Sequence, residues 1–219
     1  MLFEDRFEAG RVLASKLSEF SGRDDVVVLA LPRGGVPVGY EVARALKAQL
    51  DVFVVRKLGT PGQEELAMGA LGPGGVTVLN REVIQALGIA QSTIEAVAKR
   101  EQRELERREQ KYRGGRPAVD VRGRTAILVD DGLATGSSMR VAAKALRTEG
   151  ASQIVVAVPV ASPSTCADFE TVVDKVVCAT TREPFRAVGQ WYRDFSQTTD
   201  EEVRDLLTRA ASASLPRAA

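Results

Sequence analysis

Along the chain, segments with a continuous run of apolar residues alternate with segments in which apolar residues recur at helical spacing. Residues 26–31 are a continuous apolar, β-branched run that Pro32 ends, which is typical of a strand buried on both faces of a parallel sheet. Residues 37–49 have apolar positions at helical spacing, and residues 51–55 form a second apolar run. A strand, a helix and a further strand in this order predict one βαβ unit.

A second series of the same kind begins at Thr125. It predicts strands at 126–129, 154–158 and 172–179, a loop at 130–136, and helices at 138–149 and from Ser162–Pro163 onward. An amphipathic helix over residues 5–20 precedes both series. The alternation predicts an α/β fold, an open parallel twisted sheet flanked by helices. Ligands of such sheets bind outside the carboxyl ends of the strands.

The segment between the two series is different in character. Residues 56–75 include six glycines and two prolines, which predicts a long mobile loop or a hairpin, and such segments are often functional lids. A short strand at 76–79 and a short helix at 81–87 follow. From Ser92 to Arg113 twelve of 22 residues are charged, yet Ala98, Leu105 and Tyr112 recur every seven residues. This spacing predicts a long exposed helix with a narrow apolar seam.

We therefore expect residues 1–219 to form one domain with three additions: a mobile lid at 56–75, a helical insertion at 80–116, and a small C-terminal hood or tail at 180–219.

Composition removes several classes of function. The formal charge is +1, so no field of the whole molecule favours nucleic acid or a membrane surface. The chain has no histidine, which excludes His-dependent triads and zinc sites that need imidazole. We interpret Cys166 and Cys178 as packing residues of a reducing compartment. The N-terminus lacks the pattern of a signal peptide and no apolar run could span a membrane, so a cytoplasmic protein is expected.

The strongest chemical pattern covers residues 127–139, a buried strand followed by Asp130, Asp131, a loop of small residues and hydroxyls at a helix start. Free amides at a helix N-terminus suit a phosphate monoester. Neighbouring carboxylates accept hydrogen bonds from a vicinal diol or hold a hydrated Mg²⁺. A five-carbon sugar phosphate satisfies both halves of the pattern.

This segment resembles the signature of the type I phosphoribosyltransferases: four apolar residues, Asp-Asp, two small or apolar residues, and Ala-Thr-Gly. The order of elements from about residue 24 to 180 is also similar to that family's core. The resemblance implies phosphoribosyl pyrophosphate as substrate, Mg²⁺ as cofactor and a homodimer. It makes Asp130 and Asp131 catalytic, holding the ribose and, through water, the metal. It makes the following loop substrate-binding: Gly132, Leu133, Ala134, Thr135, Gly136, Ser137 and Ser138.

Three further segments match the family. Arg33-Gly34-Gly35 occupies the place of its pyrophosphate loop, although an ordinary turn is the alternative. Arg56 and Lys57 stand where the family has basic residues that reach pyrophosphate, so the resemblance makes them catalytic. Residues 58–75 correspond to the flexible catalytic loop, in which Glu64 and Glu65 would assist proton transfer or simply be solvated.

The acceptor is open at this stage. The 6-oxopurine enzymes of the family have a third Asp where this chain has Ala134, and the sequence looks more like the adenine type, although its mobile loop does not match that subgroup closely. A nucleobase or related small acceptor is expected. Phe185, Trp191 and Tyr192 are the candidates for stacking on a base, with packing onto the core as the alternative.

Three functions are compatible with these patterns. The first is a transferase that releases pyrophosphate, and the second is a non-catalytic regulator that senses phosphoribosyl pyrophosphate or a nucleotide. A dinucleotide-dependent oxidoreductase depends only on Gly34 to Gly39, which lacks the G-x-G-x-x-G spacing. Arg33, Arg56, Lys57 and a long lid favour turnover. Residues 99–116 carry eight basic and four acidic side chains, and a solvated helix face explains them better than a nucleic-acid partner does.

Overall fold

The structure, a computed structural model, describes residues 2–214 except for the side chains of Glu65 and Ser214. Its centre is a five-stranded sheet in the order β2-β1-β6-β7-β8, and every neighbouring pair is parallel. The strands are β1 (Val26–Ala30), β2 (Gln49–Val52), β6 (Thr125–Val129), β7 (Gln153–Ala161) and β8 (Lys175–Thr181). The predicted fold class, an open parallel sheet flanked by helices, is confirmed.

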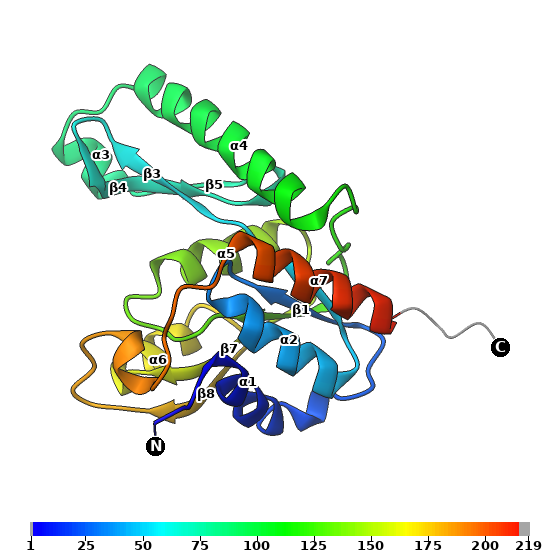
Figure 1. Ribbon diagram of the computed structural model, residues 1–219. Coiled ribbons are helices and arrows are strands. Elements are labelled where there is room, and N and C mark those ends of the chain that lie inside the picture. The colour runs from blue at the N-terminus through cyan, green and yellow to red at the C-terminus, as the bar shows by residue number, and fades with distance from the viewer. Residues whose placement is uncertain (1, 215–219) are drawn as a thin grey trace.

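Helices cover both faces of this sheet (Figure 1), and strand alternation decides which side chains meet them. Val28 and Ala30 of β1 pack with α1 (Arg6–Ser15), α2 (Gly35–Leu46) and α7 (Asp200–Ser214). Val27 and Leu29 pack with α5 (Ser137–Thr148) and α6 (Pro163–Glu170) on the other face. The sheet with these five helices is called the core below.

The remaining elements form a second body, the lobe, over residues 56–113. Its antiparallel sheet consists of β3 (Arg56–Thr60), β4 (Gln63–Leu71) and β5 (Thr77–Leu79), followed by α3 (Arg81–Ala86) and α4 (Gln91–Arg113). Figure 1 shows α4 lying along the outer side of this sheet and reaching α7 with its C-terminal end. Of the two forms expected for residues 56–75, the structure has the hairpin, β3–β4.

The apolar seam of α4 faces inward. Leu105 is fully buried, Tyr112 is 4% exposed, and both belong to the same apolar cluster as β2 and α7. The predicted long helix and its seam are confirmed, but the seam is covered by this chain itself. It therefore supplies no surface for the homodimer that the family resemblance implies.

Two features differ from the sequence expectations. Part of the segment expected to be a C-terminal hood or tail is helix α7, whose Val203, Leu206 and Leu207 are buried against the core, while residues 215–219 lie outside the described residues. Cys166 and Cys178, interpreted above as packing residues, form a disulfide. The physical reason is that α6 packs on β8, which brings the two Cα atoms to 6.8 Å from each other.

Within residues 2–214, none of the helices combines the length and the apolar character that crossing a bilayer requires.

Three short 3₁₀ turns complete the fold: η1 (Ser18–Phe20), η2 (Pro73–Gly75) and η3 (Val188–Trp191). The last of these connects the core to the segment before α7, where Phe185, Trp191, Tyr192 and Phe195 lie.

Candidate functional site

The carboxyl ends of β1 and β6 lie side by side at the point where the strand order reverses. Ala30 is in register with Val129, and the amide of Leu31 donates to the carbonyl of Val129 over 2.9 Å. The chain goes from β1 through α2 to β2 on one side, and β6, β7 and β8 follow on the other. Such a reversal leaves a crevice in which open α/β sheets bind ligands. The loops at 31–35 and 130–136 both start there.

Asp130 and Asp131 occupy the exit of β6. Oδ1 of Asp130 accepts the amide hydrogen of Asp131 at 2.8 Å, and Oδ2 of Asp131 accepts from Nε of Arg6 at 2.9 Å. Burial raises the pKa of both carboxyls, and the charge of Asp131 raises that of Asp130 further. The guanidinium of Arg6 opposes both shifts. The pair is thus a concentrated negative charge with one cation beside it.

Arg6 is a site residue that the sequence analysis missed. Its guanidinium carbon lies 3.9 Å from the ring centroid of Phe195, and its NH1 donates to the carbonyl of Ser196 at 2.7 Å. The side chains of Arg6 and Asp131 are only 11% and 14% exposed. Because 125 positions separate these two residues, no local pattern in the sequence could have paired them.

Glycines allow the two loops to approach each other. A Cβ on Gly34 would overlap the carboxylate of Asp131, and one on Gly35 would lie 2.8 Å from the carbonyl oxygen of Val129. Cβ atoms of real residues do not come this close to other atoms, so only glycine fits at positions 34 and 35. The glycines of the predicted pyrophosphate loop are therefore required by their contact with the aspartate pair.

The loop after Asp131 ends at the N-terminus of α5. Gly136 adopts φ +69°, where a Cβ would also meet the ring of Phe169, and it offers no side chain to cap the helix. The first amides of α5 therefore have no partner within the helix. Ser137 and Ser138 are exposed there, and Oγ of Ser137 lies 3.0 Å from Oγ1 of Thr135. Free amides with hydroxyls beside them are the groups that a helix start can offer to an anion.

Three other loop residues have structural roles in this arrangement. The amide of Leu133 donates to the carbonyl of Val160 at 2.9 Å, and its side chain is buried. A Cβ on Gly132 would lie 2.5 Å from Val188. The carbonyl of Ala134 accepts from the hydroxyl of Thr165 at 3.0 Å. The resemblance made all three substrate-binding, but the structure uses them to anchor the loop to β7, η3 and α6.

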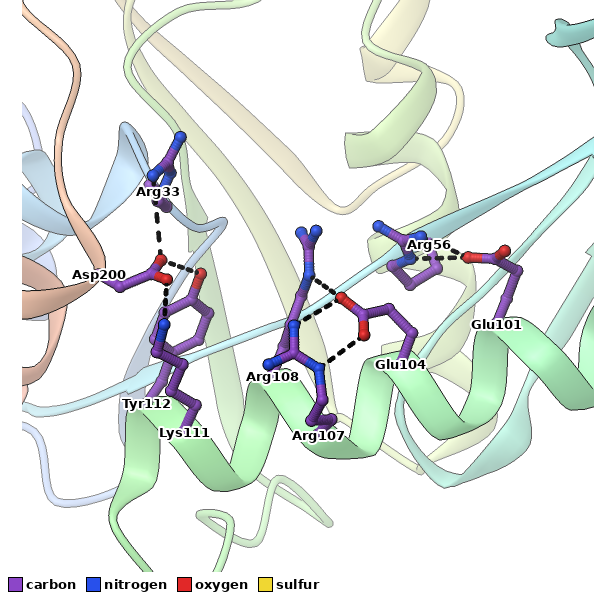
Figure 2. Close-up of polar contacts among 9 residues, drawn as sticks. All are labelled: Arg33, Arg56, Glu101, Glu104, Arg107, Arg108, Lys111, Tyr112 and Asp200. Atoms are coloured by element: carbon purple, nitrogen blue, oxygen red, sulfur yellow. Dashed lines mark hydrogen bonds and ion pairs between the residues drawn. The ribbon is translucent and has the colours of Figure 1, made fainter.

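Arg33 extends from the first loop toward α7 and the C-terminal end of α4 (Figure 2). Its NH1 lies 4.0 Å from Oδ1 of Asp200, which also accepts from the hydroxyl of Tyr112 at 2.9 Å. Nζ of Lys111 lies 2.6 Å from Oδ2 of the same carboxylate. Burial raises the pKa of Tyr112 to about 12, so its hydroxyl remains a donor at neutral pH. Asp200 was not recognised in the sequence because α7 was not predicted.

Arg56 and Lys57 are adjacent in β3 and therefore point to opposite faces of the lobe sheet. Nε of Arg56 donates to Glu101 of α4 at 2.9 Å. Lys57 instead lines a cavity of about 690 Å³ between the other face of the sheet and the start of α5, with Ser137 and Ser138 on its opposite wall. The structure thus separates the two predicted basic residues, and Lys57 is the one beside the start of α5.

The three candidate base-binding rings also differ from one another. Tyr192 is 5% exposed, packs 5.6 Å from Phe3 between ring centroids, and donates its hydroxyl hydrogen to the backbone carbonyl of Asp131. It therefore positions Asp131 and offers no free face. Phe185 and Trp191 are half-buried and stack on each other with centroids 6.2 Å apart.

The donor atoms at the end of β6 fit a hydrated magnesium ion. Within residues 2–214, apart from the side chains of Glu65 and Ser214, no group of three or more His, Cys, Asp or Glu side chains is placed to hold a metal. Mg²⁺ does not need such a cage, because it usually keeps several waters and binds one or two carboxylates. Asp130 and Asp131 supply two carboxylates of this kind.

Comparison with known proteins agrees with this geometry. A family model described as the phosphoribosyl transferase domain matches residues 4–189. Two Mycobacterium tuberculosis proteins, from strains H37Rv and CDC 1551 and each named as a candidate phosphoribosyl transferase, are 49% identical over 209 residues. The match covers 95% of this chain and 47% of each relative, so the chain spans about half the length of the curated relatives it matches.

A solved structure is also similar over nearly the whole chain. The crystal structure of TT1426 from Thermus thermophilus is 44% identical in sequence and has a TM-score of 0.83. The match covers 95% of this chain and 99% of the TT1426 chain. The family match includes the sheet, both loops at its carboxyl edge, and the lobe. On this match and this architecture, the chain belongs to the phosphoribosyl transferase domain family.

Proposed function

We propose that this protein transfers a 5-phosphoribosyl group from phosphoribosyl pyrophosphate to a nucleobase or related small acceptor and releases pyrophosphate. One observation carries the proposal. The largely buried aspartate pair, the loop of Arg33 with its two glycines and the free amides of α5 lie at the same carboxyl edge of the sheet. A sugar that bears a phosphate at one end and a diphosphate at the other matches this arrangement of charge.

Each part of that substrate has a partner in the site. Asp130 and Asp131 accept hydrogen bonds from the two ribose hydroxyls, as ionised carboxylates can. The first amides of α5, with Thr135 and Ser138, hold the 5-phosphate. The backbone of Gly34 and Gly35 approaches the diphosphate closely, and Arg33 supplies positive charge.

The reaction is a displacement at the anomeric carbon. A nitrogen of the acceptor forms the new bond, the bond from carbon to the diphosphate oxygen breaks, and its electron pair leaves with pyrophosphate, while the acceptor nitrogen loses its proton to water. The basic residues around the first loop stabilise the charge of the departing group. A magnesium ion held through water by Asp130 and Asp131 would neutralise part of that charge. No side chain has to act as a nucleophile.

The acceptor and the lid are proposed from the surroundings of the site. The stacked pair Phe185 and Trp191 is the candidate for contacting a planar base. The hairpin within residues 56–75, which carries Lys57, is proposed as the lid that excludes water from the reacting carbon.

The test is pyrophosphate release from phosphoribosyl pyrophosphate and Mg²⁺ in the presence of a panel of nucleobases. Release that depends on one base, and that D131N abolishes, supports the transferase. The matched control is D120N, which changes an exposed aspartate far from the crevice and should leave the rate unchanged. Tight binding of phosphoribosyl pyrophosphate with no release for any base would indicate a sensor. No binding at all would contradict both functions.

A further inference from the structure

Three carboxylates on or beside helix α4 each pair with two cations. Asp200, at the start of α7, lies against Arg33 and against Lys111 of α4. Glu104 accepts from both Arg107 and Arg108. Glu101 accepts from Arg56 of β3 and from Arg100. These three groups, called the shared carboxylates, lie along one side of α4 (Figure 2).

One cation of each pair belongs to the outer surface of α4. Arg100 and Arg107 are 67% and 62% exposed, and Lys111 is 38% exposed. The second cation of each pair is Arg56 at 26%, Arg108 at 42% or Arg33 at 36%. Of these three arginines, two are the basic residues that the family resemblance assigns to pyrophosphate. Only Arg108 comes from the helical insertion and has no assigned role.

Arg108 lies between the other two arginines. Arg56 contacts α4 at Glu101 and Arg33 reaches it near Tyr112, positions about 16 Å apart along the helix axis. Arg108 is two turns beyond Glu101 and one turn before Tyr112, and its charge acts on the Tyr112 hydroxyl together with that of Arg33. Figure 2 shows its guanidinium extending from α4 between Arg33 and Arg56.

The hydrogen bonds of Arg108 leave it available to a ligand. Only its Nε is used, donating to Oε1 of Glu104 at 2.9 Å, and among the described residues its two terminal nitrogens have no acceptor. Arg107 binds the same carboxylate twice, at 2.7 and 2.9 Å. Hydrogen bonds from Arg107 and Arg108 lower the pKa of Glu104 to about 2. If Arg108 turned away, Glu104 would therefore remain ionised and paired with Arg107.

We propose that Arg108 is a third diphosphate-binding arginine, supplied to the crevice by α4, and that Glu104 holds it until the ligand arrives. This inference rests on the proposed function, because it names a further residue for the same substrate. The three shared carboxylates pair with six cations, an excess of positive charge that suits a diphosphate better than a neutral ligand. The proposed role of Arg108 gives the charged helical insertion a function other than binding nucleic acid.

The experiment compares R108Q with R107Q in the full chain. Both changes remove one cation from the same helix turn and one partner from Glu104, so their effects on helix charge are matched. Calorimetric titration with inorganic pyrophosphate and Mg²⁺ should show about tenfold weaker binding for R108Q and less than twofold change for R107Q. R108K, which keeps the charge but loses the planar fork, should fall between R108Q and the parent protein.

A shorter anion and a folding check complete the design. The difference between R108Q and R107Q should shrink with orthophosphate, which is too short to reach both Arg33 and Arg108. Thermal unfolding of each variant checks that folding is unchanged. Equal affinities for R108Q and R107Q, with the parent binding pyrophosphate normally, would overturn the role of Arg108 and leave the proposed function intact. A parent protein that binds neither pyrophosphate nor phosphoribosyl pyrophosphate overturns the proposed function, and this assignment with it.

Discussion

The aspartate pair at the end of β6 and the shared carboxylates on or beside α4 differ in how many cations each carboxylate pairs with. Asp130 and Asp131 are buried at the end of a central strand, with Arg6 as a mostly buried counter-ion. Asp200 and Glu104 are partly exposed and Glu101 is buried, but each of the three has two cations, so one cation can leave while the other still pairs with the carboxylate. Buried pairs are costly to break and exposed ones are cheap. The aspartate pair is therefore suited to a fixed arrangement of charges, and the shared carboxylates to an exchange of partners.

The largest expected effect comes from breaking the buried pair. R6M should lower the free energy of unfolding by about 3 kcal/mol, because Asp131 then either holds its charge without a partner in a largely buried position or has to take up a proton. Urea unfolding measures the loss. R23M is the matched control, since Arg23 also pairs with an aspartate and lies over an aromatic ring, Phe20, but at the surface. A loss for R23M as large as that for R6M would contradict the contrast between buried and exposed pairs.

The next effect concerns ligand binding. D131N should weaken the binding of phosphoribosyl pyrophosphate by about 1–3 kcal/mol, because charge-assisted hydrogen bonds to the ribose are lost. Calorimetry at a temperature well below unfolding measures it. The double variant R6M/D131N should recover part of the stability that R6M loses, since neither charge then remains alone. Unchanged affinity in D131N would remove Asp131 from the site.

Crowding the two loops should have a smaller effect. G34A places a methyl group on the carboxylate of Asp131, and overpacking of this kind should cost about 1.5 kcal/mol of stability and weaken anion binding as well. The control is G62A in the turn between β3 and β4, where the added Cβ meets nothing within 4 Å but the φ of +80° is strained. G62A should lose stability only and bind ligand like the parent, whereas an equal loss of binding would show that loop contact is not the cause.

The smallest effect belongs to the shared carboxylates. D200N should lower stability by about 1 kcal/mol, because the ion pair with Lys111 is lost while the acceptor for Tyr112 remains. Hydrogen bonds from Lys111 and Tyr112 lower the pKa of Asp200 below its ordinary value of 3.8. A lowered pKa stabilises the fold above the unfolded value and stops doing so as pH falls through the folded one. The difference in the free energy of unfolding between D200N and the parent protein should thus be largest at neutral pH and vanish in acid.

A control on the same helix sharpens this last prediction. Asp205 pairs with Arg209 one turn away in α7, and both side chains are largely exposed. D205N should therefore change neither the stability at neutral pH nor its dependence on acid. If D200N is still less stable than the parent at a pH below the pKa of Asp200, contacts other than those of the ionised carboxylate are responsible.

Much of the core could be predicted because its signals are local. The apolar runs of β1 and β6, the glycines after β1 and the Asp130–Asp131 pair all lie within short stretches of sequence, and the structure brings the glycines and the aspartates into contact at the ends of these two strands. Helix α7 also had a local signal that was not used: Thr199 followed by Glu202 is a capping box, and the amide of Glu202 donates to Oγ1 of Thr199 at 3.1 Å.

Other features could not be predicted because they depend on distant residues. The pairing of Arg6 with Asp131, and of Arg33 with Asp200, requires knowing which helices cover which face of the sheet. The seam of α4 is visible in the sequence, but the surface that covers it is not. The disulfide of Cys166 and Cys178 likewise follows only from the packing of α6 on β8. Motifs contained in short stretches of sequence were thus predicted more completely than the ion pairs between residues far apart in the chain.

Side chains of β3 point alternately to the two faces of the lobe sheet, and this restricts how the chain can change in length. Arg56 and Lys57 point to opposite sides of the lobe sheet only while Lys57 remains opposite Ala70 in the hairpin. Inserting or deleting a single residue of β3 between Lys57 and the turn at residues 61–62 would exchange the two side chains, turning the lysine toward Glu101 and the arginine toward the start of α5. Homologues that differ in length at this point should therefore do so by two residues, or carry a bulge that restores the phase.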